Sequence, residues 1–473
     1  MRVQSIRNAA LASLAICALT QSPLLAQGGG GRGGGGGGGG GTGGGRGFGA
    51  APDSLDPARI LVDRLDLEKY KATILGLTKF GDRREGTDRN RAAVDWIETQ
   101  LKSYGCPTER VTYTFTERAG RGGRGGAAGD SGARGRGAGA GGGGGGGRGR
   151  GGGAGAGGDS SAAGDSAGAG RGRGAGGGRA QVAQNIAASG RPRGIRARTG
   201  VNTDSLRQPD PVLRALDTPP SVSGERQEVF CTKVGATHPN EMYIVGGHMD
   251  GIGWGEAAND DGSGSALVME LARVFSSPDV VTDRSIRFVL WNNEESGLNG
   301  AKAYVEQRDS LQGKENPPGS GKYPEPKWLG MIQHDMMLFD HGMPRADGTV
   351  SPEQRPEADV NIEFAMTSKL AAQAQDLAWA FESANEKYAT DYPANVTRHM
   401  TNTDSDPFKD LVPAISLREN ERGTQIGNGW DPQWHQPTDL YKTYSDKDFR
   451  LGLNAAQTTL SAIALLTGAV VKK

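Results

Sequence analysis

Seven side chains in the second half of the chain have the types, order and setting of a hydrolytic metal centre. They are His248, Asp250, Asp260, Glu294, Glu295, Asp335 and His435. Each lies directly after a strand-like run or in a Gly-rich loop. Imidazole and carboxylate groups without cysteine are ligands of hydrolytic zinc sites. A site of this kind, with five of these residues as direct ligands, could hold two metal ions close enough to bind one water.

The two glutamates after the apolar run 284–293 are expected to have different roles. Neighbouring residues in an extended chain point to opposite sides. One of Glu294 and Glu295 should therefore bind a metal, while the other acts as general base on the attacking water. The same alternation lets only one of His334 and Asp335 reach the site, and we favour Asp335 as a hard oxygen ligand.

The motif GGHMDG places His248 at the end of a buried run, two residues before Asp250. Asp250 could accept the other ring N–H and orient the imidazole. In ANDDGSG, Asp260 could bridge two metals, although one of Asp260 and Asp261 could instead cap the following helix. His435 lies in a loop rich in turn residues.

The elements that must position these residues follow an α/β pattern. Expected strands cover 110–118, 228–234, 241–248, 284–293, 328–335, 359–366 and 413–419, and expected helices cover 55–65, 89–105, 265–277, 299–311, 368–389 and 449–470. Strands alternating with helices predict a three-layer α/β/α domain with a mainly parallel central sheet covered on both faces. Sites in such sheets gather at the carboxyl ends of strands. The predicted ligands follow several different strands, so we expect them to meet at one edge.

The first 26 residues have the pattern of a secretory signal peptide. A positive start with Arg2 and Arg7 precedes the apolar run 9–19 and a small-residue cleavage site. We therefore expect an exported protein, periplasmic or extracellular, with no membrane span after cleavage. An N-terminal anchor that is not cleaved is the alternative. Residues 27–54 are a Gly-rich linker, expected to be disordered.

A second low-complexity stretch divides the domain into residues 55–118 and 226–473. This Gly/Arg-rich insertion, 119–225, has too few apolar residues to offset its ordering entropy and is expected to be disordered. From Arg118 to Arg198 the chain contains fourteen Arg and three Asp, while the whole chain has a formal net charge of zero. The rest of the chain is therefore acidic, which suits metal binding and disfavours a nucleic-acid surface.

Two cysteines, Cys106 and Cys231, remain after removal of the signal peptide. In an oxidising compartment they could form a disulfide. Two buried thiols are the alternative, and their spacing does not decide between the two.

Together the motifs resemble the exported di-zinc aminopeptidases of peptidase clan MH, which also includes plasma glutamate carboxypeptidase and the transferrin-receptor-like proteins. The resemblance covers about residues 55–471 without the insertion. It rests on GGHMD, ANDDGSG, NEESGLNG, HDM, TDSDPF and WHQPTD in family order.

The resemblance implies two Zn²⁺ per chain and assigns a role to each ligand. His248 and Asp335 would bind one ion, Glu295 and His435 the other, and Asp260 both. Glu294 would be the general base. The resemblance also implies a mixed eight-stranded sheet between helices and a cis peptide bond after Asp260.

Two positions depart from the family pattern, and both affect substrate binding rather than the ligands. Trp434 stands where some members have a tyrosine that polarises the scissile carbonyl, although its indole N–H could still donate. Ser405 stands where many members have histidine.

Several functions are compatible with these observations. The leading expectation is an exported zinc aminopeptidase acting on peptides. A carboxypeptidase or dipeptidase could use the same site, with Arg398 or Arg418 facing a substrate carboxylate. An inactive, receptor-like binding module would not need the full ligand set. An RNA-binding protein could use the Arg/Gly tract, but export and the absence of interleaved aromatic residues argue against it.

Overall fold

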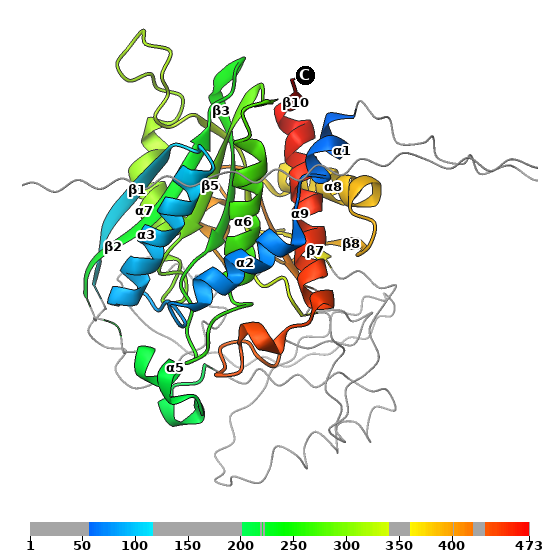
Figure 1. Ribbon diagram of the computed structural model, residues 1–473. Helices are drawn as coiled ribbons and strands as arrows, with labels where there is room; N and C mark the ends of the chain where they lie inside the picture. Colours follow the sequence, from blue (N-terminus) through cyan, green and yellow to red (C-terminus); the bar gives the residue numbers. More distant parts are fainter. Residues whose placement is uncertain are drawn as a thin grey trace, which may run out of the picture. The chain divides into compact units, whose positions relative to one another are not determined.

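A mixed sheet of eight strands forms the centre of the computed structural model (Figure 1). The structure describes residues 56–116, 201–217, 220, 223–339, 360–400, 402–419 and 431–472. The strands are β1 (Thr108–Thr116), β2 (Ser223–Lys233), β3 (His238–His248), β5 (Arg284–Trp291), β6 (Lys327–His334), β7 (Val360–Phe364), β8 (Ala394–Thr397) and β9 (Ala414–Glu419). The predicted signal peptide, the linker and most of the Gly/Arg-rich insertion lie outside the described residues.

The strand order is β1-β2-β5-β3-β6-β9-β7-β8. The central strands β5, β3, β6 and β9 are parallel, and so are β7 and β8. The pairs β1/β2, β2/β5 and β7/β9 are antiparallel. The mixed sheet with a parallel centre confirms the predicted fold class. A separate two-stranded sheet joins β4 (Val280–Val281) and β10 (Val470–Val471).

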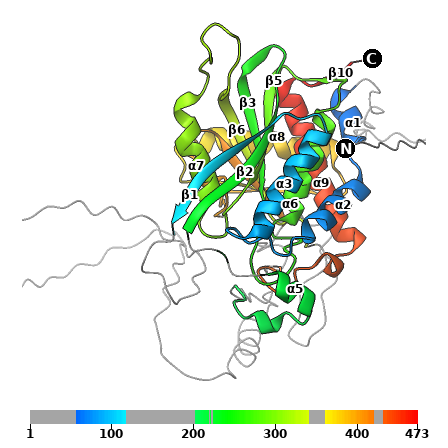
Figure 2. The ribbon, with the colours of Figure 1, turned by 60° about the vertical axis from the view of Figure 1, so that its left-hand side comes forward.

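Apolar side chains alternate between the two faces of the sheet, as the pleat of a strand requires. On β3, Val245 belongs to the larger hydrophobic core and Ile244 to the smaller one. The larger core is shared with α1 (Pro57–Val62), α2 (Leu67–Thr78), α3 (Asp88–Ser103), α6 (Gly262–Phe275), α8 (Ala371–Tyr388) and α9 (Asp446–Thr467). The smaller core is shared with α7 (Asn299–Arg308), which covers the opposite face from α3 and α6 (Figure 2).

Sequence signals at the helix ends explain where the main helices begin and stop. Asp261 is the N-cap of α6, and its side chain accepts the backbone N–H of Gly264. Ser445 and Asp448 form a capping box at the start of α9. Gly468 ends α9 in the left-handed conformation, which glycine adopts at little cost. These caps fix the ends of two helices of the larger core.

Residues 201–217 are structured, although composition alone assigns them to the 119–225 insertion. They contain a short 3₁₀ helix, η1 (Ser205–Arg207), and α5 (Pro211–Leu216). Asp204 caps η1, and Asp210 caps α5. Gln208 is fully buried between them. The folded domain therefore includes this segment, which local Asp caps and a buried anchor hold in place.

Cys106 and Cys231 form a disulfide, with their Cα atoms 5.6 Å apart. It joins the α3–β1 connection to the C-terminal end of β2. Among the described residues, no helix is both long and apolar enough to cross a membrane.

Candidate metal centre

The carboxyl ends of three parallel strands bring the predicted ligands together. His248 is the last residue of β3, Asp335 directly follows β6, and Glu294 and Glu295 follow β5. The strands are aligned at these ends, because His248 pairs with Trp291 of β5 and the preceding Gly247 pairs with His334 of β6. The site thus lies where the carboxyl ends of neighbouring parallel strands meet.

One group of buried ligand atoms contains His248, Asp260 and Asp335. Nε2 of His248 lies 3.3 Å from Oδ1 of Asp260 and 3.8 Å from Oδ1 of Asp335. The three ligand atoms all lie within 4.8 Å of one another. This spacing is short enough for one cation to contact all three.

A second group shares Asp260 with the first. Nε2 of His435 lies 2.9 Å from Oδ2 of Asp260 and 2.9 Å from Oε2 of Glu295. Asp260 therefore presents one carboxylate oxygen to each group, which is the arrangement of a bridging ligand.

The two ligand groups contain buried polar atoms that a metal ion could bind. Oδ2 of Asp260, Oε1 of Glu295 and Oδ1 of Asp335 are buried and make no hydrogen bond to the described residues. Buried carboxylates without compensation are unfavourable. A mixed set of imidazole nitrogens and carboxylate oxygens fits zinc.

The carboxylates around His248 and His435 also favour a bound cation. Burial opposes protonation of both histidines, but nearby carboxylates outweigh it. The charges of Glu294 and Asp261 hold the pKa of His248 well above its usual value, and those of Glu295 and Asp260 raise the pKa of His435 to about 10. The site therefore has an excess of negative charge that a divalent cation could neutralise.

Asp250 orients His248 through its backbone rather than its side chain, which corrects the expectation from the sequence. Nδ1 of His248 lies 3.0 Å from the carbonyl oxygen of Asp250 and 3.8 Å from its Oδ1. The carboxylate instead accepts the backbone N–H groups of Glu294, at 3.1 Å, and Glu295, at 3.4 Å. Asp250 thus links the ligand loop after β3 to the glutamate loop after β5.

Glu294 is buried next to both ligand groups. Burial raises its pKa well above the usual value, and the charge of His248 opposes that shift. Its backbone carbonyl accepts the N–H groups of Gly297 and Leu298, which closes a tight turn before α7.

Asp260 and its neighbour Asp261 have separate roles. Oδ1 of Asp261 accepts the N–H groups of Gly264 and Met336, and its Oδ2 accepts that of His248. Asp261 is thus the capping residue, and Asp260 faces the metal ligands. The peptide bond between them is cis, as the resemblance implied.

The other candidates from the sequence were His334, Arg418 and Arg398. His334 points away from the ligands to Gly246 O, at 3.1 Å, and Thr459 Oγ1, at 2.8 Å, and burial lowers its pKa to about 4. Nη2 of Arg418 lies 3.6 Å from Oδ1 of Asp335. Arg398 is exposed.

Trp434 stacks on the ring of His435, with the ring centroids 3.8 Å apart and the planes at 24°. The indole therefore restricts the orientation of the imidazole. The neighbouring Asp439 does not orient that ring. It accepts the backbone N–H groups of Asn259 and Asp260, at 2.9 and 3.1 Å.

Sequence reasoning missed several buried residues around the centre. Oδ1 of Asn259 accepts the N–H groups of Met337 and Leu338, and its amide donates to Glu419. Asn259 belongs to the ANDDGSG motif, so its position next to Asp260 was the available signal. Asp404 of the TDSDPF motif is fully buried, and burial raises its pKa.

Arg83 was also missed, and its position more than 160 residues before His248 gave no signal. Its buried guanidinium donates to the carbonyl oxygens of Met249, Glu256 and Ala257. Arg83 therefore fixes both ends of the loop between His248 and Asp260.

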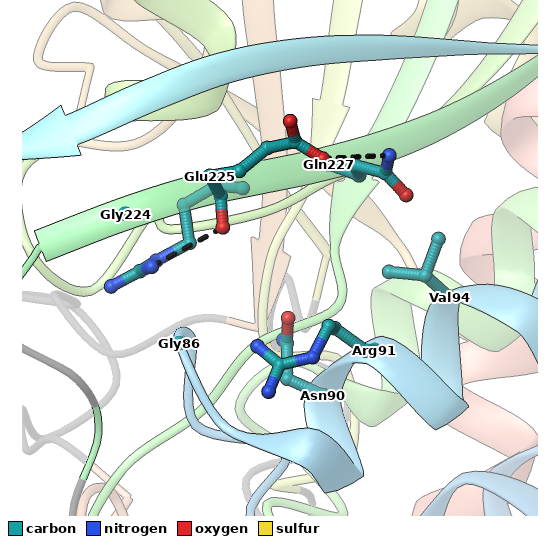
Figure 3. Close-up of a pocket in the computed structure, with 8 residues that line it drawn as sticks. Gly86, Asn90, Arg91, Val94, Gly224, Glu225 and Gln227 are labelled. Atoms are coloured by element: carbon teal, nitrogen blue, oxygen red, sulfur yellow. Dashed lines mark hydrogen bonds between the residues drawn. The ribbon is translucent and has the colours of Figure 1, made fainter.

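A separate cavity of about 410 Å³ lies between α3 and β2 (Figure 3). It is lined by Gly86, Asn90, Arg91, Val94, Gly224, Glu225, Arg226 and Gln227. None of the predicted ligands lines it. Glu85 connects the two regions, because it accepts hydrogen bonds from Arg226 and from Ser296, which follows Glu295.

The structure thus combines a mixed α/β sheet with histidine and carboxylate groups at its strand ends that could hold a metal ion. The sequence profile of Peptidase family M28 matches residues 229–457. This part of the chain matches that family, which confirms the resemblance found in the motifs.

Individual relatives match over short stretches. Aminopeptidase YwaD of Bacillus subtilis (strain 168) is 41% identical over 78 residues, which are 16% of this chain and 16% of that protein. Carboxypeptidase Q of Xenopus laevis is 37% identical over 73 residues, 15% of this chain and 16% of that protein. The matched stretches thus span about one sixth of these relatives.

The fold is also similar to that of BSAP, described as a zinc aminopeptidase from Bacillus subtilis. The TM-score is 0.51 at 14% sequence identity, over 86% of this chain and 96% of that one. At this identity, the similarity shows a shared fold.

Proposed function

We propose that this protein is a zinc-dependent metallo-exopeptidase that hydrolyses peptide bonds and releases N-terminal residues. The observation that carries the proposal is the pair of buried ligand groups that share Asp260. A structural zinc site is closed by four protein ligands. Two three-ligand groups with a common carboxylate leave room for water and substrate.

In this proposal His248 and Asp335 hold one ion, Glu295 and His435 hold the other, and Asp260 contacts both. Bound zinc would supply Lewis acidity at the scissile carbonyl and lower the pKa of a water molecule. Asp250 and Asp261 keep the ligand loops in register through the backbone N–H groups that they accept. Trp434 limits rotation of the His435 ring.

Glu294 is the proposed general base. Its carboxylate removes a proton from the attacking water and returns it to the leaving amine. A buried carboxylate with a raised pKa is suited to this exchange, because it can hold a proton between the two steps.

An aminopeptidase is the favoured activity because the two carboxylate oxygens of Asp404, which is not a proposed metal ligand, are buried without a hydrogen bond to the described residues. A free α-amino group of a peptide substrate is a cation that could pair with one of them. The similarity to aminopeptidase YwaD supports the same choice.

A carboxypeptidase or dipeptidase is the second candidate, because Arg418 is near the ligand Asp335. A guanidinium in this position could bind a substrate carboxylate. The relative named Carboxypeptidase Q supports keeping this alternative.

Export is supported by the Cys106–Cys231 disulfide, because disulfides persist mainly in oxidising compartments. Peptides are the proposed substrates.

The test compares zinc content and hydrolysis of amino-acid p-nitroanilides in wild type and Glu294→Gln. We expect about two zinc ions per chain in both proteins, and a loss of kcat of about 100-fold or more in the variant, because the base is lost while every ligand stays. Glu306→Gln, at an exposed position on α7, is the matched control and should behave as wild type.

Other outcomes discriminate between the alternatives. Zinc binding without cleavage of p-nitroanilides, together with release of C-terminal residues from N-blocked peptides, would favour the carboxypeptidase. A folded wild-type protein that binds no zinc would refute the metallopeptidase proposal.

A further inference from the structure

The loop between His248 and Asp260 is held by residues that lie outside the part of the chain matching Peptidase family M28. Two of them belong to the Asn202–Gln208 segment, directly before α5. Nδ2 of Asn202 donates to the carbonyl of Gly253 at 3.1 Å, and Nε2 of Gln208 donates to that of Trp254 at 2.7 Å. The matched part begins only at residue 229.

The same segment also binds the loop that carries His435. The backbone N–H of Asn202 donates to the carbonyl of His435 at 3.1 Å. Nε2 of Gln208 donates to the carbonyl of Pro437 at 3.0 Å. One buried amide group of Gln208 therefore joins the two loops.

The two loops meet backbone to backbone at this place. A Cβ on Gly253 would lie 2.4 Å from the carbonyl carbon of His435, so no side chain fits between the loops. The N–H of Glu256 donates to the carbonyl of Asp439 at 2.8 Å. The two loops therefore restrict each other's position.

Both loops contain backbone that needs external support. Trp254 has φ +69° and His435 has φ +55°, in the left-handed region that side chains other than glycine rarely adopt. Such conformations persist only when the surrounding structure over-determines them. The carbonyl groups of these two residues are bound by Gln208 and Asn202.

The orientation of the Gln208 amide is fixed as well. Its Oε1 accepts the N–H of Asp210 at 3.1 Å, which leaves both Nε2 hydrogens for the two loop carbonyls. The side chain is fully buried. A carboxylate at this position would place an acceptor against two carbonyl oxygens.

We propose that Gln208, with Asn202, is a positioning residue for the half of the metal centre formed by Asp260, Glu295 and His435. The inference rests on the proposed function in that it needs two bound metal ions. Loss of the Gln208 hydrogen bonds would let the His435 loop move relative to Asp260. The His248–Asp335 half is built on strand ends and would be less affected.

The experiment titrates zinc into metal-free Gln208→Glu, Gln208→Ala and wild-type protein with a competing chromophoric chelator. Replacing residues that support a metal ligand weakens affinity by about 10–100-fold. We expect that loss at one of the two sites in both variants, with the other site within about twofold of wild type. Leu206→Ala is the matched control, because Leu206 is in the same segment and is 77% exposed.

A merely structural role predicts a different result, in which both zinc affinities fall together with the urea midpoint of the metal-free protein. That outcome, or two affinities equal to those of wild type, would overturn the inference. If the Gln208 variants do not fold, Asn202→Ala serves instead, because it removes the donor to Gly253 and retains the backbone N–H to His435. Wild-type protein that binds no zinc would refute the proposed function itself.

Discussion

Asp261 holds three chain segments with one carboxylate. It binds the N–H groups of His248 at the end of β3, Gly264 in α6 and Met336 after β6. Because the neighbouring Asp260 faces both ligand groups, one of these two consecutive residues supports the loops and the other is a proposed metal ligand. The same separation occurs at His334, which binds Thr459, and Asp335, which is near His248.

A second buried carboxylate, Asp217, lies at the end of α5 and gives a testable pH dependence. Its Oδ1 lies 3.5 Å from Nε of Arg89 and accepts the N–H of Asp82. Burial and the charge of Asp82 raise the pKa of Asp217 to about 8, against the opposing charge of Arg89.

We predict that Asp217→Asn flattens the dependence of stability on pH between about 4 and 8. In this window the folded wild type keeps a proton that the unfolded chain has lost. Its stability therefore falls as pH rises, by about 1.4 kcal/mol per pH unit at most. Urea unfolding of both proteins at pH 5, 6, 7 and 8 measures the two slopes.

The control for this prediction is Asp376→Asn, at an exposed position on α8, which should leave the slope unchanged. Equal slopes for wild type and Asp217→Asn would show that Asp217 is ionised in the folded protein.

At the scale of elements, the loops after the strands have unusual backbone conformations. Trp254, Ala257, Asn293, Met336 and His435 all have positive φ values between 47° and 69°. Such residues cluster at functional sites, where the surrounding structure supports them. Here the support includes Arg83, which binds the loop after β3 at both ends.

The next prediction concerns the contact between the His248–Asp260 loop and the loop that carries His435. Gly253→Ala should destabilise the protein by more than the roughly 1–2 kcal/mol that a left-handed alanine costs, because its Cβ would meet the backbone of His435. The affinity for the zinc ion that Asp260, Glu295 and His435 would hold should also fall. Urea unfolding and zinc titration measure the two effects.

Gly319→Ala is the matched control, because Gly319 has φ +77° and nothing within 4 Å of an added Cβ. It isolates the conformational cost from the steric one. If the two alanine variants lose equal stability and keep equal zinc affinity, the loops do not constrain each other at this point.

Local patterns in the sequence were sufficient to predict much of this element structure. The runs ending at His248, Trp291 and His334 are apolar on both faces, as buried parallel strands are, and the ligands follow from their ends. The four-residue β8 was missed because it is too short to show a period. Arg83 and Gln208 were missed because their contacts are long-range, and no local pattern encodes them.

At the scale of the whole molecule, the proposed metal centre joins distant parts of the chain, so metal removal should affect global stability. We predict that removal of zinc with EDTA lowers Tm and that returning zinc restores it. Zinc at about 100 times its Kd would add about 2.7 kcal/mol per site to the stability of the folded state. Differential scanning calorimetry with and without zinc measures the change.

Two variants sharpen this prediction. Glu294→Gln retains every proposed ligand and should respond to zinc as wild type does. His435→Ala removes a ligand of one group and should gain less from zinc. A Tm that is independent of zinc in wild type would contradict a metal centre that links the strand ends.

The disulfide has a consequence for a chain that is cut. Because Cys106 and Cys231 are joined, hydrolysis of any peptide bond between them leaves both fragments in one covalent molecule. The N-terminal fragment would contain Arg83, and the C-terminal fragment would contain all the proposed ligands. A nicked protein would thus keep Arg83 tethered to the loop it supports, and only reduction of the disulfide would allow the fragment to leave.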